Sequence, residues 1–241
     1  MIYDQKDQTM IIECSISVKA AVKNHKRKIE KILIDENKHD KDFNYIRFLA
    51  KEEGIELTEL KREELDKQSC SRTYGGILAY AGGRVSDEFD ESDIFYIDGI
   101  EDPFNIGYIM RTLYAFGINN ILLPERNYES MEAQILKSSA GAFDMMNVRY
   151  MKDIDDLKCL KKDYRFIALK RGDDASDIFD YNFKKKCLFM LGGEKRGISK
   201  SLMELCDDYL FIPYASDFRN SLNAASVASV VATLIYEGKR Q

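Results

Sequence analysis

Six short apolar runs alternate with helical segments in the second half of the chain, and this alternation limits the possible folds more than any other feature. The runs are predicted strands at 94–99, 120–125, 147–152, 165–170, 187–193 and 209–213. Several are continuous apolar stretches, which is typical of strands that helices cover on both faces of a sheet. The pattern predicts an α/β fold with a mostly parallel sheet. Such sheets bind ligands beyond the carboxyl ends of their strands.

The apolar spacing between these runs indicates helices at 106–117, 129–139, 153–162, 199–206 and 221–238. The first third of the chain has its own alternation, with helices predicted at 17–24, 43–54 and 63–69 and strands at 31–35, 55–60 and 75–82. Gly82, Gly83 and the acidic run SDEFDESD separate the two regions. The sequence therefore predicts a small N-terminal α/β domain over 1–85 and a larger domain over 92–241, joined by a linker at 83–92.

The composition excludes several classes of protein. Hydrophobic residues make up 45% of the 241 residues, enough for a sizeable core, but no run of about 18 apolar residues is present to span a membrane. The N-terminus is charged early and lacks the apolar centre of a signal peptide. The five cysteines are dispersed without a C-x-x-C pair, which is typical of reduced thiols in the cytosol rather than of disulfides or a zinc site. We therefore expect a cytoplasmic protein with neither a metal nor a membrane partner.

The charge of the chain is unevenly distributed. A net charge of −5 and a pI near 5.3, taken alone, argue mildly against a nucleic-acid partner. Between residues 19 and 31, however, basic side chains far outnumber the single acid, Glu30; they are Lys19, Lys23, Lys26, Arg27, Lys28 and Lys31. Such a cluster can attract phosphates within a Debye length of roughly 8–10 Å, although a solvated helix face explains it equally well.

Three stretches lie next to the ends of predicted strands. The first is DPFNIGYIMRTLYAFG (102–117). A helical wheel groups its apolar residues on one face and places Arg111 on the other, so periodicity alone predicts an ordinary exposed arginine. Two details favour a site instead. The stretch follows a strand end, and Gly107 in its first turn costs about 1 kcal/mol relative to alanine, which suggests close approach of another group to the backbone.

The second stretch, LGGEKRGIS (191–199), follows a predicted strand and precedes a predicted helix. Its adjacent glycines, Gly192 and Gly193, would let a ligand lie against the backbone, but a tight strand-to-helix connection is the simpler explanation. The stretch matches neither the Walker pattern nor G-x-G-x-x-G, so the ordinary nucleotide and dinucleotide fingerprints are absent from it.

The third stretch, NSLNAASVAS (220–229), opens the last predicted helix with small residues. Small side chains permit the close approach of another helix, either inside the fold or across a dimer. Ser221 or Asn223 would equally serve as the N-cap of this helix.

In this order, the three stretches resemble the three motifs of the SpoU (TrmH-type) RNA 2′-O-ribose methyltransferases, which belong to the SPOUT superfamily. PFNIGYIMRTLYAFG is similar to the first motif, LFMLGGEKRGIS to the second and SLNAASVASVVA to the third. KSSAGAF (137–143) resembles the segment between the first two, and the matches extend over 94–238. The region from SVKAAVKN to GGILAY resembles more loosely the small RNA-substrate-binding domain of the family. Thr73 and Tyr74 stand where relatives often carry His-Gln.

The resemblance implies a C-terminal SPOUT domain with a trefoil knot, a small N-terminal α/β substrate-binding domain, and a homodimer whose active site lies at or near the subunit interface. S-adenosylmethionine would lie in the knot. The resemblance implies catalytic roles for Arg111, Asn105, Glu194, Asn223 and Ser221. It implies cofactor contacts for Gly192, Gly193, Ile212, Leu222 and Asn223, although the loop at 214–220 is slightly longer than in some relatives.

The implied reaction is in-line attack of a ribose 2′-oxygen on the cofactor's methyl group, without a metal. Neutralising an arginine at pH 7 costs roughly 8 kcal/mol, so we expect Arg111 to hold the target phosphate and stabilise the developing alkoxide rather than to act as the base. The basic residues Lys19, Lys23, Lys26, Arg27 and Lys28 would bind structured RNA, ribosomal before transfer RNA. A non-catalytic RNA-binding protein of the same fold is the main alternative, and a nucleotide-dependent oxidoreductase lacks its glycine fingerprint.

Overall fold

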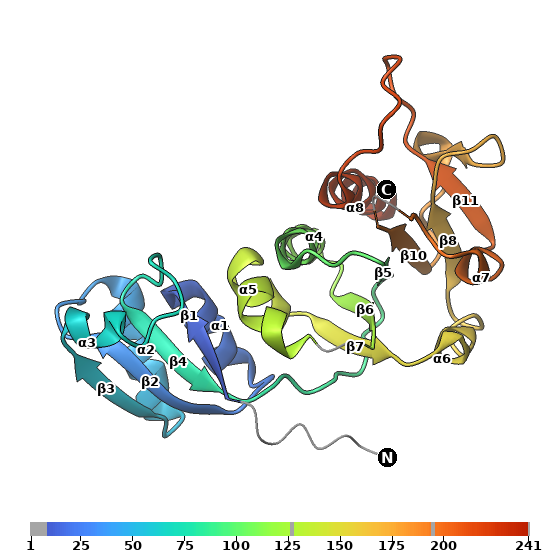
Figure 1. Cartoon of the computed structure of the whole chain (residues 1–241). Coiled ribbons are helices and arrows are strands. Elements are labelled where there is room, and N and C mark those ends of the chain that lie inside the picture. Colours follow the sequence, from blue (N-terminus) through green and yellow to red (C-terminus); the bar gives the residue numbers. More distant parts are fainter. Residues whose placement is uncertain (1–8, 126–127, 194–195, 241) are drawn as a thin grey trace. The chain divides into compact units, whose positions relative to one another are not determined.

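The computed structural model describes residues 9–125, 128–193 and 196–240, which form two compact units (Figure 1). Unit 1 consists of residues 9–85 together with 128–145, and unit 2 consists of the other described residues. The predicted linker over 83–92 contains neither helix nor strand. The two units are nevertheless not two continuous segments of the sequence. Residues 128–145 belong to unit 1, although they lie inside the larger domain predicted over 92–241.

Unit 1 is built on a sheet that has, within the described part of the chain, four strands in the order β1-β4-β2-β3. The strands are β1 (Met10–Glu13), β2 (Ile29–Asp35), β3 (Glu56–Leu60) and β4 (Ile77–Ala81). β4 pairs antiparallel with β1 and β2, while β2 pairs parallel with β3. The helical elements are α1 (Ser15–Asn24), α2 (Lys41–Glu52), α3 (Arg62–Asp66), α5 (Glu129–Ser138) and the 3₁₀ turn η1 (Ala142–Asp144). β1 was not predicted, because four residues are too few for their spacing to distinguish a strand from a loop.

The segment 128–145 joins unit 1 through α5 and η1. Helix α5 contacts β1 and α1, and η1 contacts α1. Gly141, between α5 and η1, has a φ of 88°, and a β-carbon added there would come within 2.6 Å of the Cβ of Ala20 in α1. Only glycine fits so close an approach in this backbone conformation. The KSSAGAF stretch therefore has a packing role in unit 1.

Unit 2 contains a sheet whose described strands number seven, in the order β7-β6-β5-β10-β8-β11-β9. They are β5 (Ile94–Asp98), β6 (Asn120–Pro124), β7 (Asn147–Met151), β8 (Arg165–Leu169), β9 (Ser176–Asp177), β10 (Cys187–Gly192) and β11 (Asp208–Phe211). Every pairing between them is parallel. All six predicted strands are present, so the predicted α/β class and parallel sheet are confirmed. The two-residue strand β9 is too short for a periodicity to reveal.

Helices cover both faces of this sheet, as the continuous apolar strands predict. The helical elements are α4 (Pro103–Ala115), α6 (Ile154–Lys158), η2 (Ile178–Asp180), α7 (Lys200–Met203) and α8 (Ala224–Arg240). On one face a core cluster joins β5 and β10 to α6 and α7 through Tyr96, Met190, Leu157 and Leu202. Phe95 and Phe189 are the preceding residues of their strands and point to the other face, where their rings stack with centroids 5.1 Å apart. Helix α8 contacts both α4 and β10.

The centre of the sheet is a topological switch point. Strands β5 and β10 are neighbours, but the chain continues from β5 to β6 on one side and from β10 to β11 on the other. Open parallel sheets bind their ligands at such points, beyond the carboxyl ends of the strands. Here the two ends are tied together, since the backbone N of Gly193 donates to the carbonyl oxygen of Asp98 at 2.7 Å and that of Ser199 donates to Oδ2 of Asp98 at 3.1 Å.

Candidate functional site

A cavity of about 450 Å³ lies in unit 2 at the carboxyl ends of β8, β10 and β11. Its wall also includes the residues that lead into α8. Four of the residues predicted to contact a cofactor line this cavity, namely Gly192, Gly193, Ile212 and Leu222. Ser221, predicted to contact substrate, lines it as well. The tertiary structure thus gathers the second and third sequence stretches around one space.

The adjacent glycines of the second stretch are required by backbone packing beside the cavity. A β-carbon on Gly193 would come within 2.5 Å of the carbonyl oxygen of Gly99, and one on Gly192 within 2.6 Å of the backbone nitrogen of Ile198. These neighbours are backbone atoms and cannot rotate away as a side chain can. The tight strand-to-helix connection is therefore the immediate reason for both glycines. It also brings their backbone to the cavity wall.

The first and third stretches meet through two asparagine side chains. Nδ2 of Asn223 donates to Oδ1 of Asn105 at 3.1 Å, and Oδ1 of Asn223 accepts from the backbone nitrogen of Ala225 at 2.8 Å. The interpretation of Asn223 as the N-cap of the last helix is therefore confirmed, and the same side chain also links α8 to α4. Because Asn223 caps the helix, Ser221 does not, and Ser221 is left exposed at the cavity.

Arg111 lies on the exposed side of α4, as the periodicity of the helix predicts. Within the described residues, no hydrogen bond or ion pair joins its guanidinium to Asn105, to Asn223 or to the cavity wall. The same side of α4 exposes 51% of Phe104 and 49% of Tyr108. Large aromatic side chains exposed on one helix face are typical of a surface that another molecule covers. Arg111 is therefore part of an aromatic surface and not of the cavity in its own chain.

Glu194 cannot be placed among these residues, because it lies outside the described part of the chain. Its expected role in positioning the loops of the site stays a prediction. Gly193 and Arg196, the described residues on either side of it, both line the cavity.

Two residues of the cavity wall, Arg171 and Tyr214, were not predicted, and both hold the loop before α8. Nη1 of Arg171 donates to the carbonyl oxygens of Arg219 at 2.9 Å and Asn220 at 3.4 Å. Its guanidinium carbon lies 4.6 Å from the centroid of the Tyr214 ring, whose hydroxyl accepts from the backbone nitrogen of Leu222 at 3.0 Å. One signal was present in the sequence. Arg171 directly follows a predicted strand, where α/β proteins build their sites.

The predicted basic surface of unit 1 is only partly a surface. Lys23 and Lys28 are exposed and Lys26 is half-buried. Lys19 forms an ion pair with Asp42 at 2.9 Å. These residues do not share one helix face, because α1 ends at Asn24 and the chain then turns toward β2.

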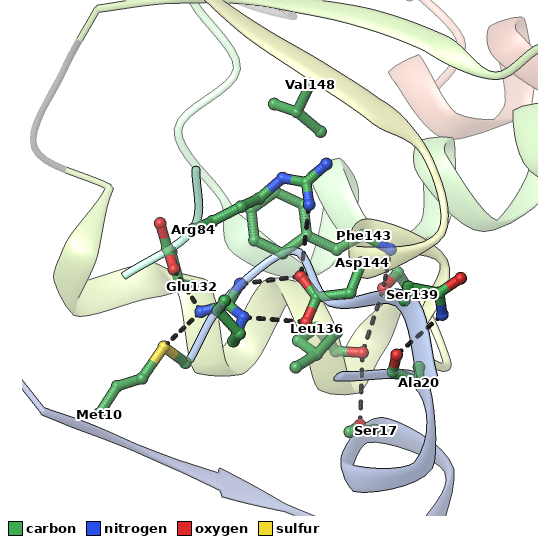
Figure 2. Close-up of polar contacts among 12 residues, drawn as sticks. Met10, Ser17, Ala20, Arg84, Glu132, Leu136, Ser139, Phe143, Asp144 and Val148 are labelled. Carbon is green, nitrogen blue, oxygen red and sulfur yellow. Dashed lines mark hydrogen bonds and ion pairs between the residues drawn. The ribbon is translucent and has the colours of Figure 1, made fainter. Parts of the chain in front are cut away.

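Arg27 points into the interior of unit 1, and this corrects its predicted role in RNA binding. Its fully buried side chain forms ion pairs with Asp144 at 2.9 Å and with Glu132 at 2.8 Å. Both carboxylates are labelled in Figure 2. Burial acts to lower the pKa of Arg27, but the charges and hydrogen bonds of the two carboxylates outweigh it and raise the pKa. A charged arginine is stable in this interior because both carboxylates pair with it. Position in a basic run could not reveal partners 105 and 117 residues away.

Two cysteines of unit 2 have raised pKa values. Burial raises the pKa of Cys187 to about 12 and that of Cys206 to about 11, so few thiolates form at neutral pH. Within residues 9–125, 128–193 and 196–240, no three His, Cys, Asp or Glu side chains are grouped to hold a metal ion. None of the helices in these ranges combines the length and apolar character needed to cross a membrane.

Two family descriptions match successive parts of the chain. The SpoU rRNA Methylase family matches residues 93–233, and the domain described as RNA 2'-O ribose methyltransferase substrate binding matches residues 16–83. A protein of Staphylococcus haemolyticus assigned to the TrmH family of tRNA/rRNA methyltransferases is 29% identical over an alignment of 228 positions that covers 88% of this chain and 90% of that protein.

Solved structures share the fold. An RNA 2'-O ribose methyltransferase matches with a TM-score of 0.80 at 18% identity, covering 97% of this chain and 90% of that chain. The SpoU methyltransferase AviRb from Streptomyces viridochromogenes, crystallised with the cofactor AdoMet, gives a TM-score of 0.79 at 18% identity and covers 95% of this chain and 90% of that chain. The SpoU rRNA Methylase match spans more than half of the chain, and the described sheet and small N-terminal domain agree with it. The chain therefore belongs to the SpoU rRNA methylase family.

Proposed function

We propose that this protein is an S-adenosylmethionine-dependent methyltransferase that modifies a ribose 2′-hydroxyl of structured RNA, with ribosomal RNA favoured over transfer RNA. The cavity at the carboxyl ends of β8, β10 and β11 is the observation that carries the proposal. Its wall contains Gly192, Gly193, Ile212 and Leu222, four of the five residues to which the family resemblance gives the cofactor contacts. Residues from two distant stretches thus surround one space at the expected end of the sheet.

The cavity fits the size and the chemistry of S-adenosylmethionine. Its volume of about 450 Å³ lies within the range of roughly 300–1,000 Å³ that is typical of small-molecule sites. The wall combines apolar side chains, among them Leu191, Ile198 and Val227, with the backbone of the glycine turn. Apolar side chains suit the adenine ring and the methylene groups of the cofactor, and backbone groups suit its polar atoms. AviRb, a structural relative, was crystallised with this cofactor.

We expect the active form to be a homodimer, with a trefoil knot in the C-terminal region of each chain as the family resemblance implies. The exposure of Phe104 and Tyr108 beside Arg111 on α4 supports a partner on that side of the helix. If a second copy covered this surface, the guanidinium of Arg111 in one copy would lie near the asparagine pair of the other copy. This arrangement would give Arg111 a catalytic role that its position within one chain does not.

Each polar side chain of the site has an expected role in the transfer. S-adenosylmethionine, when bound, supplies an electrophilic methyl group on a sulfonium. Arg111 would hold the phosphate next to the target ribose and stabilise negative charge on the 2′-oxygen, because a guanidinium binds oxyanions through parallel N–H groups. Asn105 and Asn223 would orient the ribose, Ser221 would contact the substrate, and Glu194 would position the loops. The hydroxyl proton would pass to the phosphate that Arg111 holds or to solvent.

Unit 1 would bind the RNA outside the reacting nucleotide. The exposed Lys23 and Lys28, with Lys19 and Lys26, support phosphate contacts, whereas the buried Arg27 does not belong to this set. Phosphate contacts by lysine release counterions, so binding should weaken steeply as salt is raised. The substrate-binding match over residues 16–83 agrees with this role.

Methyl transfer to purified RNA tests the proposal. The protein is incubated with S-adenosylmethionine carrying a labelled methyl group and, in separate reactions, with unmodified ribosomal or transfer RNA. Alkaline hydrolysis follows, because it cannot cleave the bond after a 2′-O-methylated ribose. We expect alkali-resistant labelled dinucleotides from ribosomal RNA. Label in transfer RNA alone would favour that substrate instead. A protein that binds RNA but, by calorimetry, not S-adenosylmethionine would be the non-catalytic alternative.

The role of Arg111 has its own test. Arg111→Lys keeps the charge but loses the planar pair of donors, so turnover should fall strongly while binding of S-adenosylmethionine stays unchanged. Near-normal turnover would contradict both the phosphate-holding and the charge-stabilising role.

A further inference from the structure

Arg171 and Tyr214 form a brace between the end of β8 and the loop that leads into α8. Arg171 is the second residue after β8, and its Nη1 donates to the carbonyl oxygens of Arg219 and Asn220 at 2.9 and 3.4 Å. The same guanidinium lies over the ring of Tyr214, with its carbon 4.6 Å from the ring centroid, a cation–π arrangement. One side chain therefore contacts both ends of the loop.

The brace reaches the cavity through Leu222. The hydroxyl of Tyr214 accepts a hydrogen bond from the backbone nitrogen of Leu222, eight residues later, at 3.0 Å. This bond closes the loop at its base. Arg171, Tyr214 and Leu222 all line the cavity, so the closed end of the loop is also part of the cavity wall.

We infer that Arg171 and Tyr214 are positioning residues that hold the backbone of Leu222 in the conformation that receives the cofactor. The inference rests on the proposed function, because it assigns the cavity to S-adenosylmethionine. Residues 215–221 are all exposed and have no core of their own to order them. Without the brace, this segment would become ordered only when the cofactor binds. The entropy cost of that ordering would then weaken cofactor binding. A loop that is already ordered therefore lets the cofactor bind more tightly.

The brace predicts a specific pattern of binding changes. Tyr214→Phe removes the acceptor for Leu222, and Arg171→Ala removes the contacts at both ends of the loop. Each should weaken the binding of S-adenosylmethionine about five- to tenfold by calorimetry, as expected for the loss of one or two hydrogen bonds. Because both act on the same loop, the double variant should bind hardly more weakly than Arg171→Ala alone. Arg171→Lys should recover part of the affinity, since it keeps the charge without the planar fork.

Kinetics separate positioning from chemistry. The KM for S-adenosylmethionine should rise in both variants, whereas kcat at saturating cofactor should stay within about twofold of the wild type, because the brace orders the cofactor site before chemistry begins. Tyr181→Phe is the matched control. It removes a hydroxyl that donates to Oδ2 of Asp208 at 2.8 Å, in the same unit but away from the cavity wall. An equal rise of KM in this control would show a general loss of stability and overturn the inference.

Hydrogen exchange of the protein without cofactor gives a second readout. Peptides that cover residues 215–223 should exchange faster in Tyr214→Phe and Arg171→Ala than in the wild type or in Tyr181→Phe. Unchanged exchange would overturn the inference. So would a wild type and variants that bind S-adenosylmethionine equally well, and in that case the proposed function would survive. A wild type that does not bind S-adenosylmethionine would instead overturn the proposed function, and the inference with it.

Discussion

The side-chain amide of Asn223 donates a hydrogen bond to the side-chain oxygen of Asn105, 118 residues earlier in the chain, at 3.1 Å. The orientation of both amides follows from one backbone group. The N–H of Ala225 can only donate, so Oδ1 of Asn223 accepts from it at 2.8 Å and Nδ2 must turn toward Asn105. In the proposed function, Nδ2 of Asn105 would donate to a substrate oxygen.

We expect the asparagine pair to stabilise unit 2. Asn223→Ala removes both the N-cap and the link to Asn105, and should lower the free energy of unfolding by about 1–2 kcal/mol in urea denaturation. Asn223→Ser keeps a cap but cannot reach Asn105, so it should recover roughly half of this loss. A double-mutant cycle of Asn223→Ser with Asn105→Ala should give a coupling energy of about 1 kcal/mol. A coupling near zero would mean that the contact contributes nothing.

The glycine turn beside the cavity should tolerate no side chain. Gly193→Ala would press a methyl group against the carbonyl oxygen of Gly99, so we expect a loss of about 1–3 kcal/mol in stability together with the loss of cofactor binding. Gly117→Ala is the control. Alanine is unfavourable at the φ of 77° of Gly117, but among the described residues no atom lies within 4 Å of the added carbon. Both variants should therefore melt earlier, and only Gly193→Ala should fail to bind S-adenosylmethionine in calorimetry. Equal binding would exclude the turn from the site.

Arg27 and its lysine neighbours should respond differently to substitution. Arg27→Ala leaves Glu132 buried without Arg27 and leaves Asp144 with the longer ion pair to Arg84 at 3.5 Å, and should destabilise unit 1 by about 3–5 kcal/mol. Lys23→Ala and Lys28→Ala remove exposed charges, so stability should change by less than about 0.5 kcal/mol while RNA affinity falls. Thermal unfolding and filter binding at two salt concentrations measure the two effects. An Arg27→Ala protein of normal stability and impaired RNA binding would restore Arg27 to the RNA surface.

Acid should weaken the contact between β8 and β11. Nη2 of Arg165 donates to Oδ1 of Asp208 at 2.7 Å, and the hydroxyl of Tyr181 donates to Oδ2 at 2.8 Å. The bond from Arg165 is the main reason why the pKa of Asp208 lies below its usual 3.8. Because the folded pKa is the lower one, the stabilisation is complete above the unfolded pKa of about 4 and is lost as the pH falls through the folded value.

The pH dependence can be measured by comparing variants. Asp208→Asn should cost about 1 kcal/mol at pH 7, since the pair is partly exposed, and much less at pH 3. Asp163→Asn, at an exposed position, should have little effect at either pH. If Asp208→Asn costs the same at both values, its carboxylate charge does not stabilise the fold.

Local patterns were sufficient to find most of the secondary structure. A buried parallel strand is apolar at successive positions because helices cover both of its faces, so all six predicted strands of unit 2 were recognisable. Strands β1 and β9 were missed because their burial depends on neighbours and not on their own few residues. The same limit affects the division of the chain. Nothing local to 128–145 shows that its elements pack against α1 and β1.

The sequence by itself determined the α/β class and the three motif stretches, because each depends on spacing along a short segment. The resemblance of these stretches to a known family then pointed to Gly192, Gly193, Ile212 and Leu222, which line the cavity. Only the tertiary structure decided that Arg27 is buried while Lys28 is exposed, that Asn105 meets Asn223, and that Arg171 holds the loop before α8. These outcomes depend on partners that lie 48 to 118 residues away. Periodicity describes the relation of a residue to its own helix or strand, whereas a side chain's partner depends on the path of the whole chain.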